Sequence, residues 1–321
     1  MKKVTAYLFA LMLVSAFVFT GCKDDDDTQP FDAQKEMADY MVAQNLDLNK
    51  MLDGFVMVAP DNGDVSAKHV IDIRSAEDFA LGHIAGAVNV TLANILTEAA
   101  NATKPILVVC YTGQTATYAV TLLRLSGYSD AAALKWGMSG WNPVFANSPK
   151  GWNGKTGDIA MGHANWTTDV APANITYDSP TFTSTTTDPS DILKSRVSTV
   201  VAEGFKTVTA DDVLANPGTF FINNYFSEAD YLGFGHIAGA KRINPMLLGE
   251  GQINYNDASM KVVTYCYTGQ TSAAITSYLR VLGYDAYSMV FGMNKLYHSN
   301  GAWTANKWSE SVPKELPYVT N

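Results

Sequence analysis

A six-residue segment that occurs twice constrains this chain more than any other feature. The sequence Cys-Tyr-Thr-Gly-Gln-Thr occupies residues 110–115 and returns at 266–271. Each copy follows an apolar run, at 105–109 and 262–265, and a helical pattern at 116–125 follows the first copy. An apolar run, a short turn with glycine and a helix are typical of a strand–loop–helix unit. The sequence therefore predicts two such units, each with a cysteine at the start of the turn.

The position of this cysteine predicts a reactive thiol. The first residue of a turn that leads into a helix lies over the helix N-terminus, where backbone N–H groups are unpaired and the dipole favours negative charge. Both effects lower the pKa of a thiol and favour its thiolate, which is the nucleophilic form. We therefore expect Cys110 and Cys266 to be nucleophiles with an anion site built from main-chain amides.

The repetition extends far beyond these six residues. Residues 82–87 and 235–240 both read Gly-His-Ile-Ala-Gly-Ala, and residues 123–128 and 279–284 share the pattern Leu-Arg-x-x-Gly-Tyr. The cysteine and the arginine of this last pattern lie 14 positions apart in both copies. Because order and spacing are kept, the chain contains a duplicated domain, and two copies of such length do not make a solenoid.

Predicted strands and helices alternate along each copy. In the first copy, strands are predicted at 55–58 and 69–73 and a helix at 91–100. This alternation indicates an α/β fold with two domains, each a mainly parallel sheet with helices on both faces. Ligand sites of such sheets lie at the carboxyl ends of the strands, where the Cys110 loop falls. We also expect an amphipathic helix at 31–52 to pack on the first domain.

Composition divides the chain into segments. Residues 148–190 are rich in Gly, Thr, Ser, Asn and Pro, which predicts an extended connector. The predicted division is a signal segment at 1–21, an acidic tether at 22–30, a first domain at 31–147, this connector, and a second domain at 191–321. The aromatic rings within the connector are expected to pin it to a domain surface, and they belong to Trp152, His163 and Trp166.

The N-terminal residues predict export and a lipid anchor. Two lysines precede an apolar stretch at 4–19 that is too short to be a convincing membrane span, as in a signal peptide. Residues 19–22, Phe-Thr-Gly-Cys, resemble a bacterial lipobox with Phe where Leu is usual, and the alternative is a plain secretory signal with an incidental Cys22. The aspartates at 24–27 predict a solvated tether and resemble the export signal of surface lipoproteins in Bacteroidetes-type bacteria. We expect lipidation at Cys22 and a place at the outer membrane, on its periplasmic or surface face.

Charge and cysteine content exclude several classes of function. The chain has 22 basic and 31 acidic residues and a net charge of −9, and loss of residues 1–21 with their two lysines leaves 22 − 2 = 20 basic residues and a net charge of −11. An acidic chain without a basic stripe argues against a nucleic-acid partner.

Three cysteines are too few for a disulfide scaffold. Without Gly-x-Gly-x-x-Gly or a Cys/His cluster at ligand spacing, no cofactor and no metal site are predicted.

Several blocks in fixed order carry a resemblance to a known family. They are Asp72-x-Arg74, Glu77-x-Phe79, the Gly-His-Ile block, the cysteine loop, Leu-Arg-x-x-Gly-Tyr, and the aromatic-Gly-Met triplets that end at Met138 and Met293. Together they resemble the rhodanese (sulfurtransferase) family in its tandem form. The resemblance covers roughly 31–147 and 191–310.

The resemblance implies a carrier of sulfane sulfur. A cysteine of this family takes sulfur from a donor such as thiosulfate or a persulfide and passes it to a thiophilic acceptor such as cyanide or a thiol. Carried over, Cys110 and Cys266 form the persulfides, loop amides hold them, and the hydroxyls of Thr115 and Thr271 donate toward the sulfur. The implied substrate-binding residues are Tyr111, Thr112, Gly113, Gln114 and Thr115 in the first loop and Tyr267, Thr268, Gly269, Gln270 and Thr271 in the second.

Loop length and charge narrow the chemistry that the resemblance implies. Related phosphatases and arsenate reductases use a loop one residue longer that ends in an arginine, and neither loop here has an arginine. Thiosulfate-using relatives commonly carry a Lys or Arg in or beside the loop, whereas these loops have none. Asp78 and Asp230 stand where some relatives carry an arginine. An anionic donor is therefore less well served, and a neutral or protein-bound persulfide is the alternative donor.

The two copies differ at one strand end. Asp72 and Arg74 of the first copy align with Asn224 and Phe226 of the second. We expect the Asp72–Arg74 pair to support the first loop as an internal ion pair. The histidines of the Gly-His-Ile blocks are expected to be structural, and the two arginines of the Leu-Arg pattern to lie on a helix surface.

A second class of function stays open from the sequence. An unpaired thiol outside the cytoplasm is liable to oxidise, so the chain could be a non-catalytic lipoprotein that serves as an interaction or sulfur-sensing module. Against this, both copies keep the same loop with its cysteine. Identical loops predict that Cys110 and Cys266 both form persulfides. Because the first copy has the fuller set of supporting residues, we expect the second to differ in donor or rate.

Overall fold

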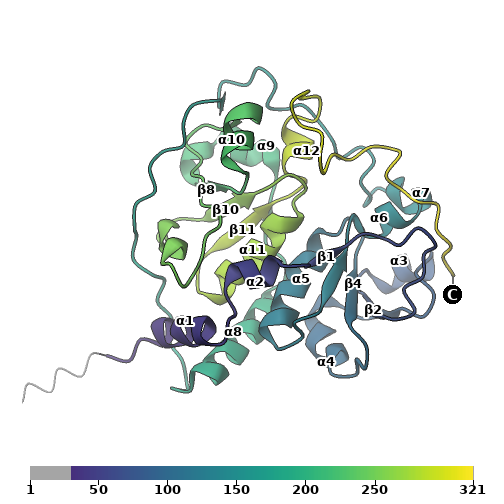
Figure 1. The fold of residues 1–321 in the computed structure, drawn as a ribbon, viewed down its shortest axis with the longest axis horizontal. Helices are drawn as coiled ribbons and strands as arrows, with labels where there is room; N and C mark the ends of the chain where they lie inside the picture. Colours follow the sequence, from purple (N-terminus) through teal and green to yellow (C-terminus); the bar gives the residue numbers. More distant parts are fainter. Residues whose placement is uncertain (1–29, 321) are drawn as a thin grey trace, which may run out of the picture. The chain divides into compact units, whose positions relative to one another are not determined.

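Two larger sheets, each with parallel strands only, form the framework of the protein (Figure 1). The computed structural model describes residues 30–320, so the predicted signal segment, Cys22 and nearly all of the tether lie outside the described residues. The first sheet has the order β1-β5-β4-β2-β3 and the second the order β7-β11-β10-β8. Their strands are β1 (Val56–Met57), β2 (His69–Asp72), β3 (Val88–Asn89), β4 (Ile106–Val109), β5 (Ala132–Leu134), β7 (Thr207–Val208), β8 (Phe221–Asn224), β10 (Val262–Tyr265) and β11 (Ala286–Met289).

Helices alternate with the strands in both repeats. The first repeat contains α3 (Ala76–Ala80), η1 (Leu92–Asn94), α4 (Ile95–Ala99), α5 (Gln114–Leu125), α6 (Gly137–Trp141) and α7 (Pro143–Ala146). The second contains α8 (Pro189–Glu203), α9 (Ala210–Ala215), η2 (Pro217–Thr219), α10 (Glu228–Phe234), η3 (Gln252–Tyr255), α11 (Gln270–Val281) and α12 (Met293–Leu296). The predicted α/β fold with two mainly parallel sheets is therefore confirmed.

Strand register shows that the duplication is structural. Asp72 of β2 lies opposite Val109 of β4, and Asn224 of β8 lies opposite Tyr265 of β10. These are equivalent pairs in the two repeats, since each partner directly precedes a loop cysteine. The alignment of Asp72 with Asn224 that the sequence predicts is confirmed.

Each central strand is buried on both faces, as in a sheet covered by helices. Along β4, Ile106 and Val108 belong to the core shared with α5, whereas Leu107 and Val109 belong to the core that contains Met138 of α6. Successive side chains of a strand point to opposite faces, so an unbroken apolar run is what this position requires. The ends of β4 and β10 carry the two cysteine loops.

The two helices that follow the cysteine loops, α5 and α11, pack against each other. Nearly every residue of both helices is buried. The Thr117 hydroxyl of α5 donates to the Gln270 carbonyl at the start of α11 over 2.9 Å. Because both helices begin at a cysteine loop, this contact brings the two loops to the same place in the molecule.

The N-terminal helical segment packs differently from the prediction. It forms two helices, α1 (Ala33–Ala43) and α2 (Leu48–Leu52), separated at Asn45, which has a positive φ of 59°. Helix α1 packs on α8, and Asp47 accepts hydrogen bonds from the backbone N–H groups of Leu248 and Gly249. The prediction that this segment packs on the first domain is therefore wrong for α1, because its apolar face meets the second repeat.

Two of the contacts that fasten the connector to the rest of the chain involve its tryptophans. Its strand β6 (Trp166–Thr167) pairs antiparallel with β9 (His236–Ile237). Trp152 is fully buried in an aromatic cluster with Trp136, Trp308 and Phe291. Trp152 stacks on Trp308 with ring centres 5.4 Å apart and meets Trp136 and Phe291 edge-on, each at 5.0 Å. Trp152 thus joins both repeats, where the sequence predicts an aromatic ring on one domain surface.

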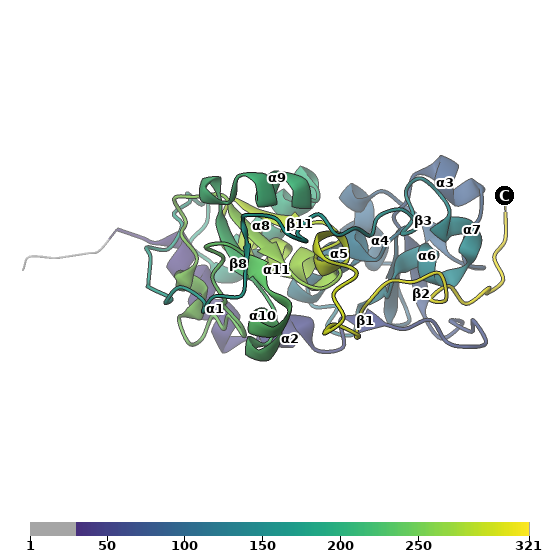
Figure 2. The same ribbon diagram turned by 90° about the horizontal axis from the view of Figure 1, so that it is seen from above.

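The C-terminal residues leave the second repeat and return to the first, as Figures 1 and 2 show. Leu316 donates its N–H to the Trp141 carbonyl and its side chain belongs to the first repeat's core. Val319 and His83 exchange backbone hydrogen bonds of 2.9 Å in both directions. The predicted second domain, 191–321, therefore includes residues that complete the first.

The two arginines of the Leu-Arg pattern are buried, so the prediction of a helix surface is wrong. Arg124 is 5% exposed and donates to backbone carbonyls of Lys50, Met51 and Ala131. Arg280 is 3% exposed and pairs with Glu203. The outer side of each helix is covered by segments distant in sequence, which a local pattern does not reveal.

Replacement of Trp152 by alanine tests how much the aromatic cluster holds the repeats together. Loss of a fully buried indole should lower the free energy of unfolding by about 3–5 kcal/mol, measured by urea denaturation. The control is Val170→Ala, also in the connector but 80% exposed, which should stay within about 0.5 kcal/mol of the parent. Equal stability of the Trp152 and Val170 variants would contradict the role given to the cluster.

Candidate active site

The first cysteine loop places a sulfur atom against the start of α5. Cys110 directly follows β4, and Gly113, in the left-handed conformation with φ 83°, precedes the helix. The Gly113 N–H donates to Cys110 Sγ over 3.2 Å. Cys110 is 6% exposed. The sulfur therefore lies at a helix N-terminus with a main-chain amide directed at it.

The second loop has the same path but a different hydrogen-bond pattern. Cys266 follows β10, and Gly269, with φ 81°, precedes α11. The Ser272 N–H donates to Cys266 Sγ over 3.3 Å, and the Cys266 thiol donates to the Ser272 hydroxyl oxygen over 3.7 Å. Cys266 is only 1% exposed. This sulfur is more enclosed than that of Cys110.

The hydroxyl groups predicted to reach the sulfur atoms do not do so. Neither the Thr115 nor the Thr271 hydroxyl makes a hydrogen bond to a cysteine within residues 30–320, and both side chains are half-buried at the second position of their helices. The next residue of each helix faces inward, and in the second loop that residue is Ser272. In the first loop it is Ala116, which has no hydroxyl group.

The acidity of Cys110 differs from the prediction. Burial raises the pKa of the Cys110 thiol above its ordinary value, although hydrogen bonds from the amides of Ala116, Thr112 and Gly113 act to lower it. The carboxylate of Asp72 adds to the rise. The sequence predicts a lowered pKa because it reveals the amides but not how fully the fold withdraws the sulfur from water.

The charged pair of the first repeat is an internal ion pair. Arg74 Nη2 lies 2.6 Å from Asp72 Oδ2, and both side chains are 1% exposed. Arg74 Nη2 also donates to the Gly82 carbonyl, and its guanidinium lies over the Tyr111 ring at 5.1 Å. The pair therefore supports the loop through Tyr111 and does not contact the sulfur.

The second repeat replaces this ion pair with aromatic stacking. Asn224 Oδ1 accepts from the Phe226 N–H over 2.8 Å, as Asp72 Oδ1 accepts from the Arg74 N–H over 3.0 Å. The Phe226 ring stacks on Tyr267 with centres 4.5 Å apart. The same turn thus carries a cation beside one loop and an apolar ring beside the other.

The backbone of each aromatic-Gly-Met triplet packs against the backbone of a cysteine loop. The Met138 N–H donates to the Cys110 carbonyl over 2.8 Å, and the Met293 N–H to the Cys266 carbonyl over 3.0 Å. A Cβ atom on Gly137 or Gly292 would collide with these cysteine carbonyls. Glycine is required at both positions because the backbone of the triplet passes so close to the loop.

The two loops are also joined to each other. Gln270 of the second loop donates to the Thr112 carbonyl of the first over 3.1 Å, and Gln114 accepts from the Phe291 N–H over 3.0 Å. Each glutamine end fills the space that a Cβ atom would need on the glycine of the opposite loop. Gln114 and Gln270, predicted to bind substrate, therefore connect the two sites.

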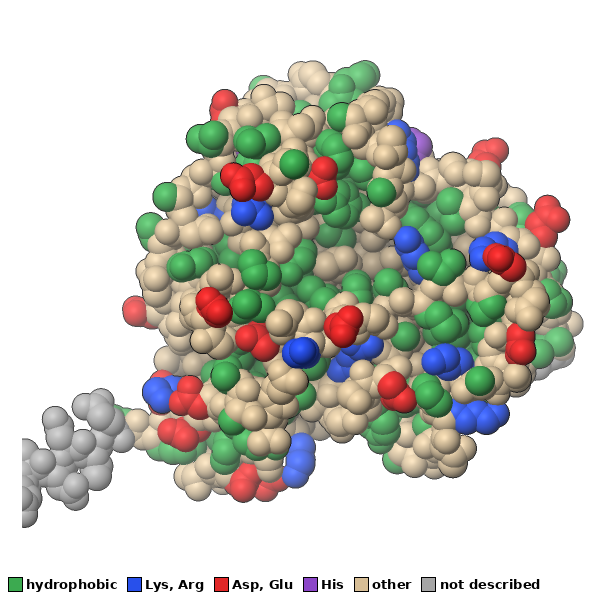
Figure 3. All heavy atoms as spheres, in the orientation of Figure 1, with side chains coloured by type: hydrophobic (Ala, Val, Ile, Leu, Met, Phe, Trp, Pro, Cys, Tyr) green, Lys and Arg blue, Asp and Glu red, His purple; other side chains and the backbone are tan. Residues whose placement is uncertain are grey.

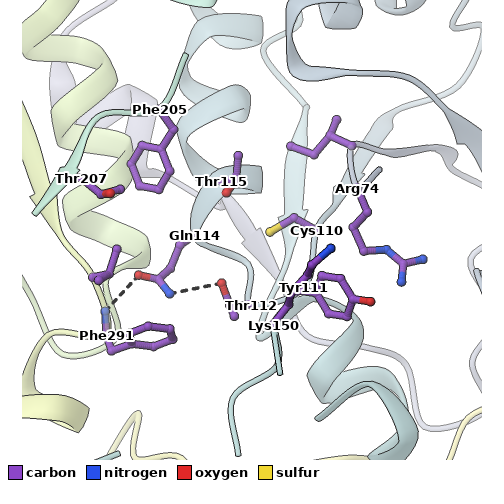
Figure 4. Close-up of a pocket in the computed structure, with 12 residues that line it drawn as sticks. Arg74, Cys110, Tyr111, Thr112, Gln114, Thr115, Lys150, Phe205, Thr207 and Phe291 are labelled. Carbon is purple, nitrogen blue, oxygen red and sulfur yellow. Dashed lines mark hydrogen bonds between the residues drawn. The ribbon is translucent and has the colours of Figure 1, made fainter. Parts of the chain in front are cut away.

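A cavity of about 330 Å³ opens over Cys110 (Figure 4). Residues from both repeats and the connector line it. The second repeat supplies Phe205, Thr207 and Phe291, and the connector supplies Lys150. Sequence reasoning missed these residues because they come from segments 40 or more positions after Cys110, with no motif of their own. The first site is therefore completed by the second repeat.

Lys150 of the connector lies beside the first cysteine loop, which contains no Lys or Arg itself. Its Nζ lies 2.6 Å from Asp78 Oδ2, and this bond raises the pKa of Lys150. Burial acts to raise the pKa of Asp78, but hydrogen bonds from Lys150, Ser75 and Tyr111 outweigh it, so that this pKa is lowered. The first loop has no cation of its own, as its sequence shows, but the fold brings the cation of Lys150 beside it.

The two Gly-His-Ile histidines hold the fold together. His83 stacks on Phe79 at 3.7 Å and its Nδ1 contacts the Phe79 carbonyl at 3.0 Å. His236 stacks on Tyr231 at 3.6 Å with the same kind of carbonyl contact at 3.1 Å. Both are buried. Within residues 30–320, no group of three or more His, Cys, Asp or Glu side chains is placed to hold a metal ion.

The fold and the two loops define a tandem protein of α/β domains, each with a thiol at the carboxyl end of its central strand. A family model for the rhodanese-like domain matches residues 59–143 and 225–304, one match in each repeat. The chain therefore belongs to the rhodanese family of sulfurtransferases.

The relatives found by sequence match about one repeat each, whereas a solved structure matches most of the chain. Thiosulfate sulfurtransferase GlpE of Pseudomonas paraeruginosa is 31% identical over 100 residues, which are 30% of this chain and 91% of the relative. The protein of the same name from Pseudomonas putida is 38% identical over 79 residues, 24% of this chain and 71% of the relative. In a crystal structure of thiosulfate sulfurtransferase from Pseudomonas aeruginosa, the matched part is 14% identical with a TM-score of 0.29, and it covers 85% of this chain and 48% of that one.

The raised pKa of Cys110 predicts a steep pH dependence of its reactivity. Only the thiolate attacks an alkylating agent, so the rate should rise about tenfold per pH unit through neutral pH and level off only above the ordinary thiol pKa. The measurement is iodoacetamide labelling of Cys110 in a Cys266→Ser chain, read by peptide mass so that Cys22 is counted separately. A plateau already at neutral pH would contradict the raised pKa.

Proposed function

We propose that the chain transfers sulfane sulfur from a donor to a thiophilic acceptor through a persulfide on Cys110. The observation that carries this proposal is the position of the sulfur, which lies against the start of α5 and lines an open cavity. Main-chain amides are suited to hold a persulfide anion without a metal. The family of the chain and the names of its relatives support the same chemistry.

The reaction that these groups support has two steps. The Cys110 thiolate attacks the outer sulfur of the donor, a new S–S bond forms, and the donor's own bond to that sulfur breaks with its electron pair on the leaving group. That leaving group is sulfite from thiosulfate, or a thiolate from a persulfide or polysulfide. Cyanide or an acceptor thiolate then attacks the outer sulfur, and the Cys110 thiolate is restored. No net oxidant or reductant is needed.

Lys150 favours an anionic donor at the first site. An ammonium group has three N–H donors, and the bond to Asp78 uses one of them. Lys150 is solvent-exposed at the cavity rim, where its remaining donors can meet a sulfonate. Phe205 and Phe291 supply apolar walls opposite. Thiosulfate is therefore a suitable donor, whereas the loop sequence alone favours a neutral one.

The two cysteines have unequal access to a donor. Cys110 lines the cavity, whereas Cys266 is 1% exposed and its Tyr267 neighbour is covered by Phe226. Cys110 is therefore the cysteine that meets the donor, and Cys266 reacts more slowly. The identical loop sequences do not distinguish these roles.

The location of the reaction is inferred from the N-terminal sequence. The lipobox-like residues 19–22 and the acidic run after them support a lipid anchor on Cys22 at the outer membrane. The donor and acceptor are then small sulfur compounds of the cell envelope, and the membrane is contacted through the lipid alone. Among the residues that the structure describes, no helix has the length and apolar character needed to cross a membrane.

Separate Cys110→Ser and Cys266→Ser chains test the assignment of roles. Thiocyanate formation from thiosulfate and cyanide should fall to a slow residual rate in the Cys110 variant and stay near the parent rate in the Cys266 variant. Intact mass after incubation with thiosulfate or polysulfide should show one added sulfur atom on the Cys266 variant. Full activity without Cys110 would refute the assignment, and no adduct on any chain would favour the non-catalytic module.

Replacement of Lys150 by glutamine tests the anionic donor. The KM for thiosulfate should rise several-fold with little change in kcat, and the difference should shrink at high salt because an exposed charge is screened. Lys194→Gln is the control, because this lysine of α8 is 73% exposed and pairs with Asp191 away from the cavity. Equal KM values for the two variants would show that Lys150 does not contact the donor.

A further inference from the structure

The two repeats differ in the layer directly behind their cysteines. Between α11 and the second sheet, four fully buried positions carry hydroxyl groups where the first repeat carries alkyl side chains. The equivalences follow from the loop alignment and from strand register, in which Thr264 lies opposite Ser288 as Val108 lies opposite Ala133. The matched residues are Ser272 and Ala116, Ser288 and Ala133, Thr264 and Val108, and Thr276 and Val120.

The hydroxyl groups of Ser288 and Ser272 form a hydrogen-bonded chain that ends at Cys266 Sγ. Ser272 Oγ lies 3.7 Å from Cys266 Sγ and 2.8 Å from Ser288 Oγ. The Ser272 N–H is also directed at the sulfur, over 3.3 Å. Cys266 is therefore approached by an amide and a hydroxyl of the same residue, and the second serine lies behind that hydroxyl.

The hydroxyl groups are costly for the fold. Transfer of a hydroxyl from water to an apolar interior without a partner is unfavourable. Thr264 Oγ1 and Thr276 Oγ1 have no hydrogen-bond partner among residues 30–320. The first repeat shows that the same backbone packs with alanine and valine at these positions. Packing alone therefore does not account for the serine pair.

Few charged groups face Cys266 from the elements around it. Tyr267 lies next to it in the loop and donates its hydroxyl hydrogen to Asp230 of α10. Strand β10 contributes the buried phenol of Tyr265, and the strand end of β8 contributes Asn224 and Phe226, where the first repeat has an acid and an arginine. Helix α11 and strand β11 face the sulfur with the two serines. A negative charge on Cys266 thus depends on neutral donors.

We propose that Ser272 is a positioning residue that holds the Cys266 thiolate by donating its hydroxyl hydrogen, with Ser288 donating to Ser272 in turn. In the thiol form, the sulfur donates to Ser272 Oγ. When the proton leaves to water, the Ser272 hydroxyl rotates and donates to the sulfur. The first repeat has no such pair, so different donors surround the two sulfur atoms. The inference deepens the proposed function, because it assigns how the second repeat keeps an enclosed cysteine able to carry sulfur.

Ionisation of Cys266 is the direct test. In a full-length Cys110→Ser chain, the ultraviolet absorbance of the thiolate is followed against pH, and a chain lacking both Cys110 and Cys266 is subtracted to remove Cys22 and the tyrosines. Ser272→Ala should raise the midpoint by about one pH unit, the size expected for a lost hydrogen bond to a charged sulfur. Ser288→Ala should raise the midpoint less. Ser272→Thr keeps the hydroxyl, so its midpoint should stay near that of the chain with Ser272.

The first repeat offers the reciprocal control. Ala116→Ser in a Cys266→Ser chain should lower the Cys110 midpoint, because it introduces the missing hydroxyl. An unchanged midpoint in both Ser272→Ala and Ala116→Ser would overturn the inference, and Ala116→Ser decides alone if the serine variant fails to fold. The titration does not depend on sulfur transfer. A shifted midpoint in a chain without transferase activity would therefore refute the proposed function and leave this inference standing.

Discussion

The contact between α5 and α11 is the interaction on which the rest of the structure depends. Each helix begins at a cysteine loop and is buried along nearly its whole length, so that the two repeats share one core. The contact places Gln114 and Gln270 across from the opposite loops. It also brings Phe205 and Phe291 of the second repeat to the cavity over Cys110. Neither loop has its surroundings until both repeats are folded.

One backbone supports two different sites. The turn after β2 and the turn after β8 have the same internal hydrogen bond, but the first carries an ion pair and the second a stacked phenylalanine. The layer behind the loops is apolar in the first repeat and bears hydroxyl groups in the second. Duplication has thus kept the strand–loop–helix unit and changed what touches the sulfur. The open site at Cys110 has charged side chains at its rim, whereas the enclosed site at Cys266 has buried hydroxyl groups between its helix and its sheet.

The sequence predicts what is local and periodic in this molecule. The alternation of strands and helices, the duplication, and the alignment of Asp72 with Asn224 follow from short-range patterns and are confirmed. The place of Lys150 depends on the path of a connector without periodicity, and the packing of α1 depends on a partner about 150 positions away. The pKa of Cys110 depends on how far the whole fold excludes water. None of these has a local signature.

The crossing of the chain ends has a consequence for how the protein can be divided. Helix α1 precedes the first repeat but covers the second, and Leu316 follows the second repeat but fills the core of the first. A cut within the connector would leave each half without a piece of its apolar covering. The halves are therefore not interchangeable modules, and a single-domain relative could not replace either one by a simple splice. The chain arose by duplication of one domain, but no single cut now divides it into two complete domains.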